Sequence, residues 1–345
     1  MSQATKQTKR MDDLNPEKCI GCGKCTKSCS FLEKYDMDLR DFSEKPELSY
    51  GCFLCGRCTE VCPVSIDGKE IALRMRTAQC EENGGTLTER GFQGLLWEKD
   101  PYRFANYRRG RSASVLWTGC NFTGFFQKTE KQLIKRLSGY GIGVIYDCCG
   151  KPVEELGLIQ DAERNLTEIG KKLLDAGVRE LIMVCPNCYY YMRGRLPAEI
   201  RLTTIYRKLD ELGIGDRITL SCDGNESMEF PLYRPCPDRT EELFLSDLAP
   251  FLPKEAELET FSGLQCCGLG GCAAAKEPEL AEGMSGKALS LGGGKLYTYC
   301  ASCISQFRRK GIEGAQHVLP LILGIEEPFP GGIRPFLNKA IKKII

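Results

Sequence analysis

Two cysteine runs near the N-terminus decide the fold of this chain: Cys19-Ile-Gly-Cys22-Gly-Lys-Cys25-Thr-Lys-Ser-Cys29 and Cys52-Phe-Leu-Cys55-Gly-Arg-Cys58-Thr-Glu-Val-Cys62. In each run, three cysteines follow at intervals of three residues and a fourth comes four residues later. Such a loop wraps around one inorganic cube, and Gly21, Gly23 and Gly56 let backbone N–H groups approach its sulfides. The runs therefore predict two iron–sulfur clusters.

Both runs resemble those of bacterial two-cluster ferredoxins, in which the fourth cysteine of each run crosses over to the other cluster. The resemblance implies a cubane [4Fe-4S] cluster on each of two ligand sets, which are Cys19, Cys22, Cys25 and Cys62, and Cys52, Cys55, Cys58 and Cys29. The alternative is a pair of all-cysteine zinc ribbons, which would leave the regular four-cysteine runs unexplained. Strong helix formers over residues 67–82 predict a helix, so we expect a mainly helical ferredoxin domain.

The chain contains 21 cysteines but a single histidine, His317. Metal sites that mix histidine with cysteine or carboxylate are therefore largely excluded, and all-thiolate ligation remains. The 47 basic and 46 acidic residues leave a net charge of +1, which gives no footprint for nucleic acid. No apolar stretch reaches the ~18 residues of a membrane span, and we find no secretory signal. We expect a cytoplasmic protein, in a complex or at the cytosolic face of a membrane partner, whose reduced thiols bind metal.

A second cysteine pattern occurs twice after residue 112. Corresponding cysteines are offset by 115 to 118 residues, so the C-terminal part contains a duplicated unit. The first unit has Cys120, Cys148, Cys149, Cys185 and Cys188, and the second has Cys236, Cys266, Cys267, Cys300 and Cys303. Each adjacent pair is followed by a glycine, Gly150 or Gly268, which can adopt the positive φ of a turn that brings both thiols to one centre.

Short runs rich in β-branched, aromatic and aliphatic residues end just before cysteines, over residues 113–117, 143–146, 181–184, 230–233 and 296–299. Helix-like stretches, such as residues 123–137 and 156–174, lie between them. This alternation predicts α/β units with short parallel sheets, whose carboxyl edges carry the cysteines in two facing pockets. Together with the ferredoxin domain, the fold class is α+β and multidomain. Five thiolates in each unit exceed what a cubane needs, which favours an unusual cluster or a cubane with a spare reactive thiol.

The duplicated C…CCG…CxxC pattern resembles the CCG domain in the catalytic subunit of heterodisulfide reductase. Its fusion behind a two-cluster ferredoxin resembles the D-type chain of that enzyme, and related architecture occurs in iron–sulfur subunits of anaerobic glycerol-3-phosphate dehydrogenase and glycolate oxidase. The resemblance implies that each CCG unit binds a non-cubane [4Fe-4S] cluster through its five cysteines, and that the paired clusters cleave a disulfide. Cys272 is an added thiol where a small residue is expected.

These patterns divide the chain into six segments. They are a flexible N-terminus (residues 1–12), the ferredoxin domain (13–95), a linker (96–112), the first CCG unit (113–222), the second CCG unit (223–325) and an amphipathic C-terminal tail (326–345). We expect Cys80 to be a core residue, Cys222 to be incidental and His317 to be structural. Packing on its own domain is the first expectation for the tail, ahead of a partner subunit or a membrane surface.

The patterns predict a heterodisulfide reductase-like oxidoreductase, in which electrons pass through the cubanes to the CCG clusters and reduce a disulfide-type small molecule. Breaking one S–S bond takes two electrons, so two facing one-electron centres suit the chemistry. The rival is a non-catalytic electron-transfer subunit that links a flavin dehydrogenase to a quinone or other carrier. Because the chain has no flavin or nicotinamide fingerprint, its electron donor must be another subunit, containing flavin or iron–sulfur clusters.

Overall fold

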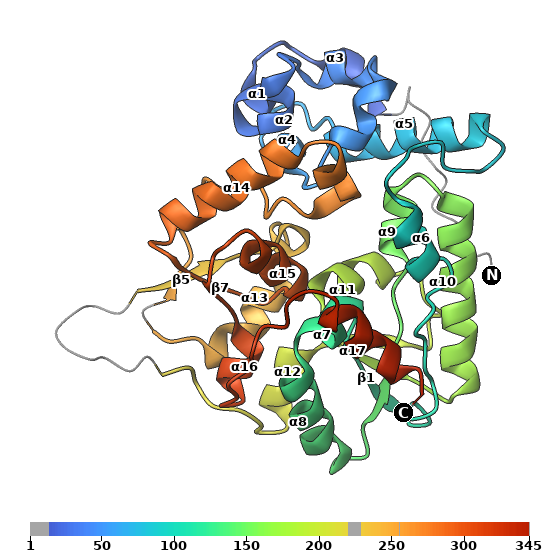
Figure 1. Cartoon of the computed structure of the whole chain (residues 1–345), viewed down its shortest axis with the longest axis vertical. Helices are drawn as coiled ribbons and strands as arrows, with labels where there is room; N and C mark the ends of the chain where they lie inside the picture. Colours follow the sequence, from blue (N-terminus) through green and yellow to red (C-terminus); the bar gives the residue numbers. More distant parts are fainter. Residues whose placement is uncertain (1–13, 220–228, 255, 345) are drawn as a thin grey trace.

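Short helices build the N-terminal part of the chain. The computed structural model describes residues 14–219, 229–254 and 256–344, so the predicted flexible N-terminus and Cys222 lie outside the described residues. In each cysteine run a short helix follows a glycine with positive φ: α1 (Lys24–Ser28) follows Gly23, and α4 (Arg57–Glu60) follows Gly56. The other helical elements are η2 (Pro16–Lys18), α2 (Ser30–Lys34), α3 (Leu39–Ser43), η3 (Pro46–Gly51) and α5 (Gly68–Glu82). This part forms a cap at one end of the molecule (Figure 1), and α5 confirms the helix predicted over residues 67–82.

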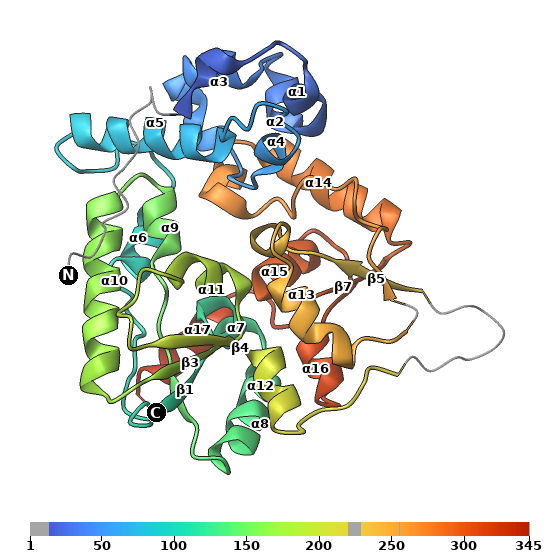
Figure 2. The same ribbon diagram turned by 180° about the vertical axis from the view of Figure 1, so that it is seen from behind.

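Two four-stranded parallel sheets form within the described residues that follow. The first contains β1 (Ser114–Trp117), β2 (Gly143–Ile145), β3 (Glu180–Met183) and β4 (Arg201–Thr204), in the order β2-β1-β3-β4. The second contains β5 (Phe230–Tyr233), β6 (Ala256–Glu257), β7 (Lys295–Thr298) and β8 (Gly314–His317), in the equivalent order β6-β5-β7-β8. Figure 2 shows the two sheets on opposite sides of the molecule. The shared strand order agrees with duplication, and the fold is α+β.

Helices cover both sheets, which explains why the central strands are apolar on both faces. The first sheet is accompanied by α7 (Cys120–Phe125), α8 (Gln127–Ser138), α9 (Lys151–Glu155), α10 (Ile159–Asp175), α11 (Pro186–Met192) and α12 (Ile205–Glu211). The second is accompanied by η4 (Cys236–Asp238), α13 (Leu243–Leu248), η5 (Ala249–Phe251), η6 (Gly270–Ala275), α14 (Pro278–Leu291), α15 (Ala301–Arg309) and α16 (Val318–Ile322). One continuous hydrophobic core joins the two units, from Trp117 in β1 to Leu296 in β7. The units therefore pack as one body.

One helix predicted as continuous, over residues 123–137, is broken in two, and the helix predicted over residues 156–174 begins only at Ile159. The stretch over residues 123–137 breaks at Phe126, and the carboxylate of Glu327 accepts hydrogen bonds from the N–H groups of Lys128 and Thr129 at 3.2 and 2.6 Å. A distant residue thus satisfies the free donors that the break creates. The second helix begins after Gly157, whose φ of 93° and close approach to the backbone of α5 leave no room for a side chain.

Arg76 on α5 joins the ferredoxin domain to both CCG units. Its side chain is fully buried, and its guanidinium donates to the carbonyls of Ser49 and Cys52 at 2.8 Å. It also donates to the carbonyls of Glu155 at 2.6 Å and Gly271 at 2.9 Å, which belong to the first and second CCG units. The planar fork of arginine can satisfy all four acceptors at once, so this residue fixes how the three parts meet.

Replacing Arg76 with methionine is expected to lower the free energy of unfolding by about 3 to 5 kcal/mol, because it leaves several buried carbonyls without donors. The measurement is anaerobic thermal unfolding of the cluster-loaded protein. Arg76→Lys is the matched variant: it keeps the charge but loses the fork, so it should be destabilised as well, to a smaller extent. A methionine variant that unfolds at the wild-type temperature would contradict this role.

The predicted tail returns to the first CCG unit. Helix α17 (Arg334–Lys342) packs on α7, where Asn338 Nδ2 donates to the carbonyl of Gly124 at 2.8 Å. The ammonium of Lys342 lies 2.5 Å from the buried carboxylate of Glu130. The predicted linker (residues 96–112) begins within α6 (Gln93–Lys99). Farther along it, Asn106 Nδ2 donates to the carbonyl of Lys342 at 2.6 Å. The tail therefore packs on its own chain, but on the first CCG unit rather than on the adjacent second one.

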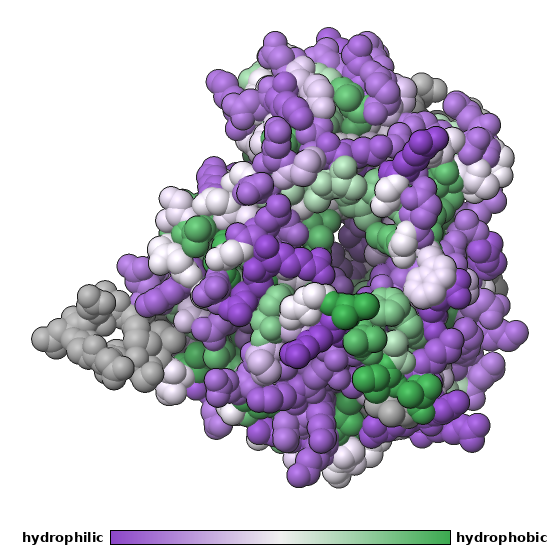
Figure 3. All heavy atoms as spheres, viewed as in Figure 1, coloured by the Kyte–Doolittle hydropathy of each residue, from purple (hydrophilic) through white to green (hydrophobic). Residues whose placement is uncertain are grey.

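The outer face of α17 carries an exposed apolar patch (Figure 3). Its exposed members are Ile333, Leu337, Ile341 and Ile344. Trp97 of α6 is half exposed beside it and stacks on Phe336 with ring centroids 6.1 Å apart. Among the helices of the described residues, none is long and apolar enough to cross a bilayer.

Candidate metal centres and facing thiol sets

The outer set, Cys19, Cys22, Cys25 and Cys62, lines one small pocket in the ferredoxin domain. Cys62 belongs to the second run but joins the three leading cysteines of the first, which is the grouping that the ferredoxin resemblance implies. Gly23 and Pro63 complete the lining beside the cysteines. Cys22 is exposed, so this set lies at the surface of the molecule.

The inner set contains Cys29, Cys52, Cys55 and Cys58. The pKa of Cys29 is raised to about 12, mainly by burial and in addition by the neighbouring Cys55 and Cys52. Burial raises the pKa of Cys52 to about 11. The pKa of Cys58 also lies well above its usual range, through burial and then the proximity of the other three. Four thiols gathered in a buried site become thiolates when a bound metal centre compensates their charge.

The five cysteines of the first CCG unit, the first thiol set, form a chain of contacts. The thiol of Cys120 contacts that of Cys148, and Cys185 contacts Cys188. Cys149 lies at the middle, where hydrogen bonds from Cys148 and Cys188 lower its pKa to about 5 despite burial. These contacts link all five thiols in one continuous group.

The cysteines of the second CCG unit, the second thiol set, repeat this arrangement. Hydrogen bonds from Cys266 and Cys303 lower the pKa of Cys267 to about 6. A hydrogen bond from Cys303 also lowers the pKa of Cys300 to about 7, and Cys236 lies close enough to Cys300 for their charges to interact. In both CCG pairs, these hydrogen bonds lower the pKa of the second cysteine and so favour the thiolate, the form that binds metal.

The local fold explains why the thiols converge. Cys185 directly precedes α11 and Cys300 directly precedes α15, so both lie at helix N-termini, where N–H groups favour a negative charge. Gly150 and Gly268 have φ values of 86° and 84°. These values confirm the predicted turn after each cysteine pair.

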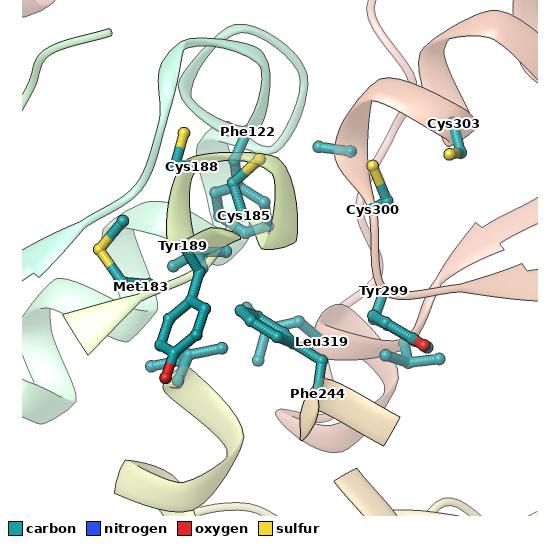
Figure 4. Packing of buried hydrophobic residues seen from close by; sticks show 14 of the residues in the cluster. Phe122, Met183, Cys185, Cys188, Tyr189, Phe244, Tyr299, Cys300, Cys303 and Leu319 are labelled. Atoms are coloured by element: carbon teal, nitrogen blue, oxygen red, sulfur yellow. The ribbon is translucent and has the colours of Figure 1, made fainter. Parts of the chain in front are cut away.

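The two thiol sets face each other across the junction of the CCG units. Figure 4 shows Cys185 and Cys188 on one side of this junction, and Cys300 and Cys303 on the other. Asn187, between the first pair, places its Nδ2 at 3.6 Å from Cys300 Sγ. Next to Cys120, Asn121 Nδ2 donates to the hydroxyl of Ser302 at 2.7 Å. The CxxC loop of the second unit is therefore hydrogen-bonded to residues beside the first thiol set.

Two lysines accompany the thiol sets, the buried Lys99 and the partly exposed Lys151. Burial alone would lower the pKa of Lys99, but the charges of Cys120 and Cys148 raise it well above its usual range. Lys151 forms an ion pair with Glu155, which raises the pKa of Lys151. The negative charges of Cys236, in the second set, and Cys149, in the first, raise this pKa as well. These ammonium groups offset the negative charge of clustered thiolates.

The donor chemistry fits iron–sulfur clusters. All four sets consist of thiols alone, which suit iron–sulfur clusters and zinc. Among the described residues, no three His, Cys, Asp or Glu side chains surround one position as the ligands of a single ion would. The two four-cysteine runs and the two five-cysteine units have the regular spacing that favours iron–sulfur clusters.

Among the residues that the structure describes, Cys80, Cys272 and His317 belong to none of the four sets. Cys80 is buried, near the hydroxyl of Tyr50 at 3.7 Å, as predicted for a core residue. Cys272 is half buried and has φ 56°, and burial raises its pKa to about 12. The Nδ1 atom of His317 accepts a hydrogen bond from the N–H of Leu319 at 3.1 Å, and burial lowers its pKa to about 3. His317 is therefore a neutral, structural residue.

Comparison with known proteins agrees with this arrangement. A 4Fe-4S dicluster domain matches residues 18–66, and a cysteine-rich domain of the CCG type matches residues 114–193. These matches confirm the resemblance that the cysteine spacing predicted. Both domains indicate iron–sulfur clusters.

The chain is similar to three known iron–sulfur or reductase-related proteins. One chain of a fumarate reductase (CoM/CoB) from Methanothermobacter marburgensis is 25% identical over 78% of this chain and 62% of its own length. An uncharacterized iron–sulfur protein of Methanococcus maripaludis is 24% identical over 79% of this chain and 63% of its own. A protein of Archaeoglobus profundus that is itself named for its likeness to one heterodisulfide reductase subunit is 31% identical over 28% of this chain and 55% of its own. The chain thus spans less than two thirds of these relatives. It is an iron–sulfur electron-transfer protein related to heterodisulfide reductase-like subunits.

Proposed function

We propose that this chain is the disulfide-reducing subunit of an oxidoreductase complex. Electrons enter at the outer set, pass to the inner set and reach two centres on the facing thiol sets, where a small disulfide is reduced to two thiols. The observation that carries this proposal is that the two thiol sets face each other, with Asn187 of the first unit 3.6 Å from Cys300 of the second.

Each set would hold one [4Fe-4S] cluster, the outer and inner sets cubanes and the two facing sets clusters of non-cubane type. The ligands on the facing sets are Cys120, Cys148, Cys149, Cys185 and Cys188, and Cys236, Cys266, Cys267, Cys300 and Cys303. Bound there, the clusters supply single electrons, and two of them together supply the two that cleavage of an S–S bond requires.

The chain's own residues hold and shield this site. Hydrogen bonds from neighbouring thiols lower the pKa of Cys149 and of Cys267, which favours negative ligands at the centre of each set. Lys151, which is influenced by thiols of both sets, can stabilise the negative charge that develops as a disulfide accepts electrons. His317 is buried, and this burial lowers its pKa, which disfavours the protonated form that a proton donor needs.

An electron donor must come from another subunit, containing flavin or iron–sulfur clusters. The exposed position of Cys22 supports entry at the outer set. The relatives' names describe subunits of larger reductases, which supports a complex of several chains.

The rival function, a conduit from a flavin dehydrogenase to a quinone or other carrier, also has a supporting observation. The thiols of Cys55 and Cys266 are hydrogen-bonded, so the inner set directly adjoins the second thiol set. The outer set, the inner set and the second thiol set would then form one electron-transfer path. An electron conduit needs only this path, whereas disulfide reduction needs both facing thiol sets.

Disulfide reduction by the anaerobically assembled chain tests the proposal. Given a reduced dye, the chain should release two thiols for each disulfide consumed, and each chain should contain about sixteen iron atoms in four clusters. About eight iron atoms would contradict clusters on the facing sets. A full complement of iron without thiol release would favour the conduit.

A further inference from the structure

Gln265 of the second CCG unit contacts the inner set of the ferredoxin domain. Its Nε2 lies 3.3 Å from Cys29 Sγ and 3.8 Å from Cys55 Sγ. Its Oε1 accepts hydrogen bonds from the backbone N–H of Ser30 at 2.8 Å and from the Ser30 hydroxyl at 2.9 Å. The side chain is buried, so water does not compete strongly for these bonds.

The orientation of this amide follows from its partners. The backbone N–H of Ser30 can only donate, so it must face the amide oxygen. The NH₂ group is thereby turned toward the two sulfur atoms, and its two N–H bonds match the two acceptors. Gln265 therefore donates to the inner set through Nε2, while Ser30 fixes the orientation of the amide through Oε1.

The same place is the junction of the inner set with the second thiol set. Gln265 directly precedes Cys266, whose thiol is hydrogen-bonded to Cys55. Arg239 donates from Nη2 to the carbonyl of Gln265 at 2.8 Å, and its positive charge interacts with those of Cys236 and Cys55. Two thiol sets, an amide donor and a guanidinium thus meet at one buried contact.

The first CCG unit has a different residue at the matching position. Asp147 precedes Cys148 there, and its carboxylate accepts from the Tyr107 hydroxyl and the Cys148 N–H, both at 2.7 Å. An ionised carboxylate has no proton to donate to a thiolate. The two units therefore differ at this position, and the amide is present in the second unit, whose Gln265 and Cys266 contact the inner set.

We propose that Gln265 is a positioning residue that holds the inner set against the second thiol set and raises the reduction potential of the cluster bound by the inner set. Hydrogen bonds to ligand sulfurs stabilise the more negative, reduced form. Electrons then leave the ferredoxin domain at the contact of Cys55 with Cys266, one at a time, with no covalent bond made or broken. Only this direction of flow rests on the proposed function.

Redox titration of the full, anaerobically assembled chain, followed by electron paramagnetic resonance, tests the inference. Gln265→Met removes the donor and keeps the length of the side chain. At the wild-type midpoint potential, the ratio of reduced to oxidised inner cluster should fall about tenfold, which corresponds to about 59 mV for one electron. Gln265→Glu keeps the acceptor for Ser30 but places a carboxylate beside the thiolates, so its fall should be larger. The midpoint of the outer cluster should not change.

Asn187→Leu is the matched control, because it removes an amide from Cys300 of the second thiol set and should leave the inner midpoint unchanged. An unchanged inner midpoint in both Gln265 variants would overturn the proposal, as would loss of all clusters from both. Loss of the inner cluster alone supports the positioning role. The titration needs no substrate, so a chain that shifts as expected but reduces no disulfide would contradict the proposed function and not this inference.

Discussion

Replacing Cys149 or Cys267 with alanine is expected to abolish disulfide reduction, with a loss of more than about a hundredfold, or ~2.7 kcal/mol of barrier. Each residue lies at the middle of its set and accepts hydrogen bonds from two neighbouring thiols. If the two sets act together, a single remaining one-electron centre would leave a thiyl radical rather than two thiols. The measurement is thiol release with a reduced dye as donor.

The double variant separates a cooperating pair from a serial conduit. Residues that act as one unit show strongly non-additive losses, so Cys149→Ala with Cys267→Ala should be scarcely worse than either change alone. Cys80→Ala is the matched control, since it removes a buried thiol that belongs to none of the four sets. If either single variant kept more than about a tenth of wild-type activity with its other clusters intact, the conduit would be favoured.

Cys58→Ala is expected to remove the inner cluster and stop electron delivery from a protein donor, while the facing sets keep their clusters. The reason is that Cys58 belongs to the inner set, whose neighbours are Cys29, Cys52 and Cys55. Reduction of a disulfide by a small dye, which reaches the facing sets directly, should continue. Paired assays with a protein donor and with a dye measure this difference.

Cys22→Ala offers a comparison at the outer set, where it should also block delivery from the protein donor. The division into an entry path and a reaction site would be wrong if Cys58→Ala stopped dye-driven reduction while the facing clusters remained. Spectra of the variant before the assay establish which clusters are present.

Local patterns in the sequence predicted much of the fold. The strand expected over residues 230–233 is β5 itself, and the other predicted strands lie within one or two residues of β1, β2, β3 and β7. The turns at Gly150 and Gly268 were also predictable, because adjacent thiols can converge only where the backbone turns. These features depend on neighbours within a few residues.

The contacts between the parts could not be predicted in this way. Gln265 meets Cys29 across 236 residues of sequence, and a single buried amide leaves no periodic signal. The helix break at Phe126 involves Glu327, and the turn at Gly157, before the start of α10, packs against α5; both partners are distant in the sequence. Such contacts belong to the tertiary fold, and they include the junction that we propose for electron transfer.

One measurement tests the central claim most directly. The chain, reduced under anaerobic conditions and freed of excess dye, is mixed once with a small disulfide, and both the thiols released and the oxidation of each cluster are followed in time. We predict two thiols per disulfide, with the clusters of both facing sets oxidised together. If the facing clusters stay reduced and no thiol forms, while a quinone analogue oxidises the same protein, the chain is a conduit and the claim is wrong.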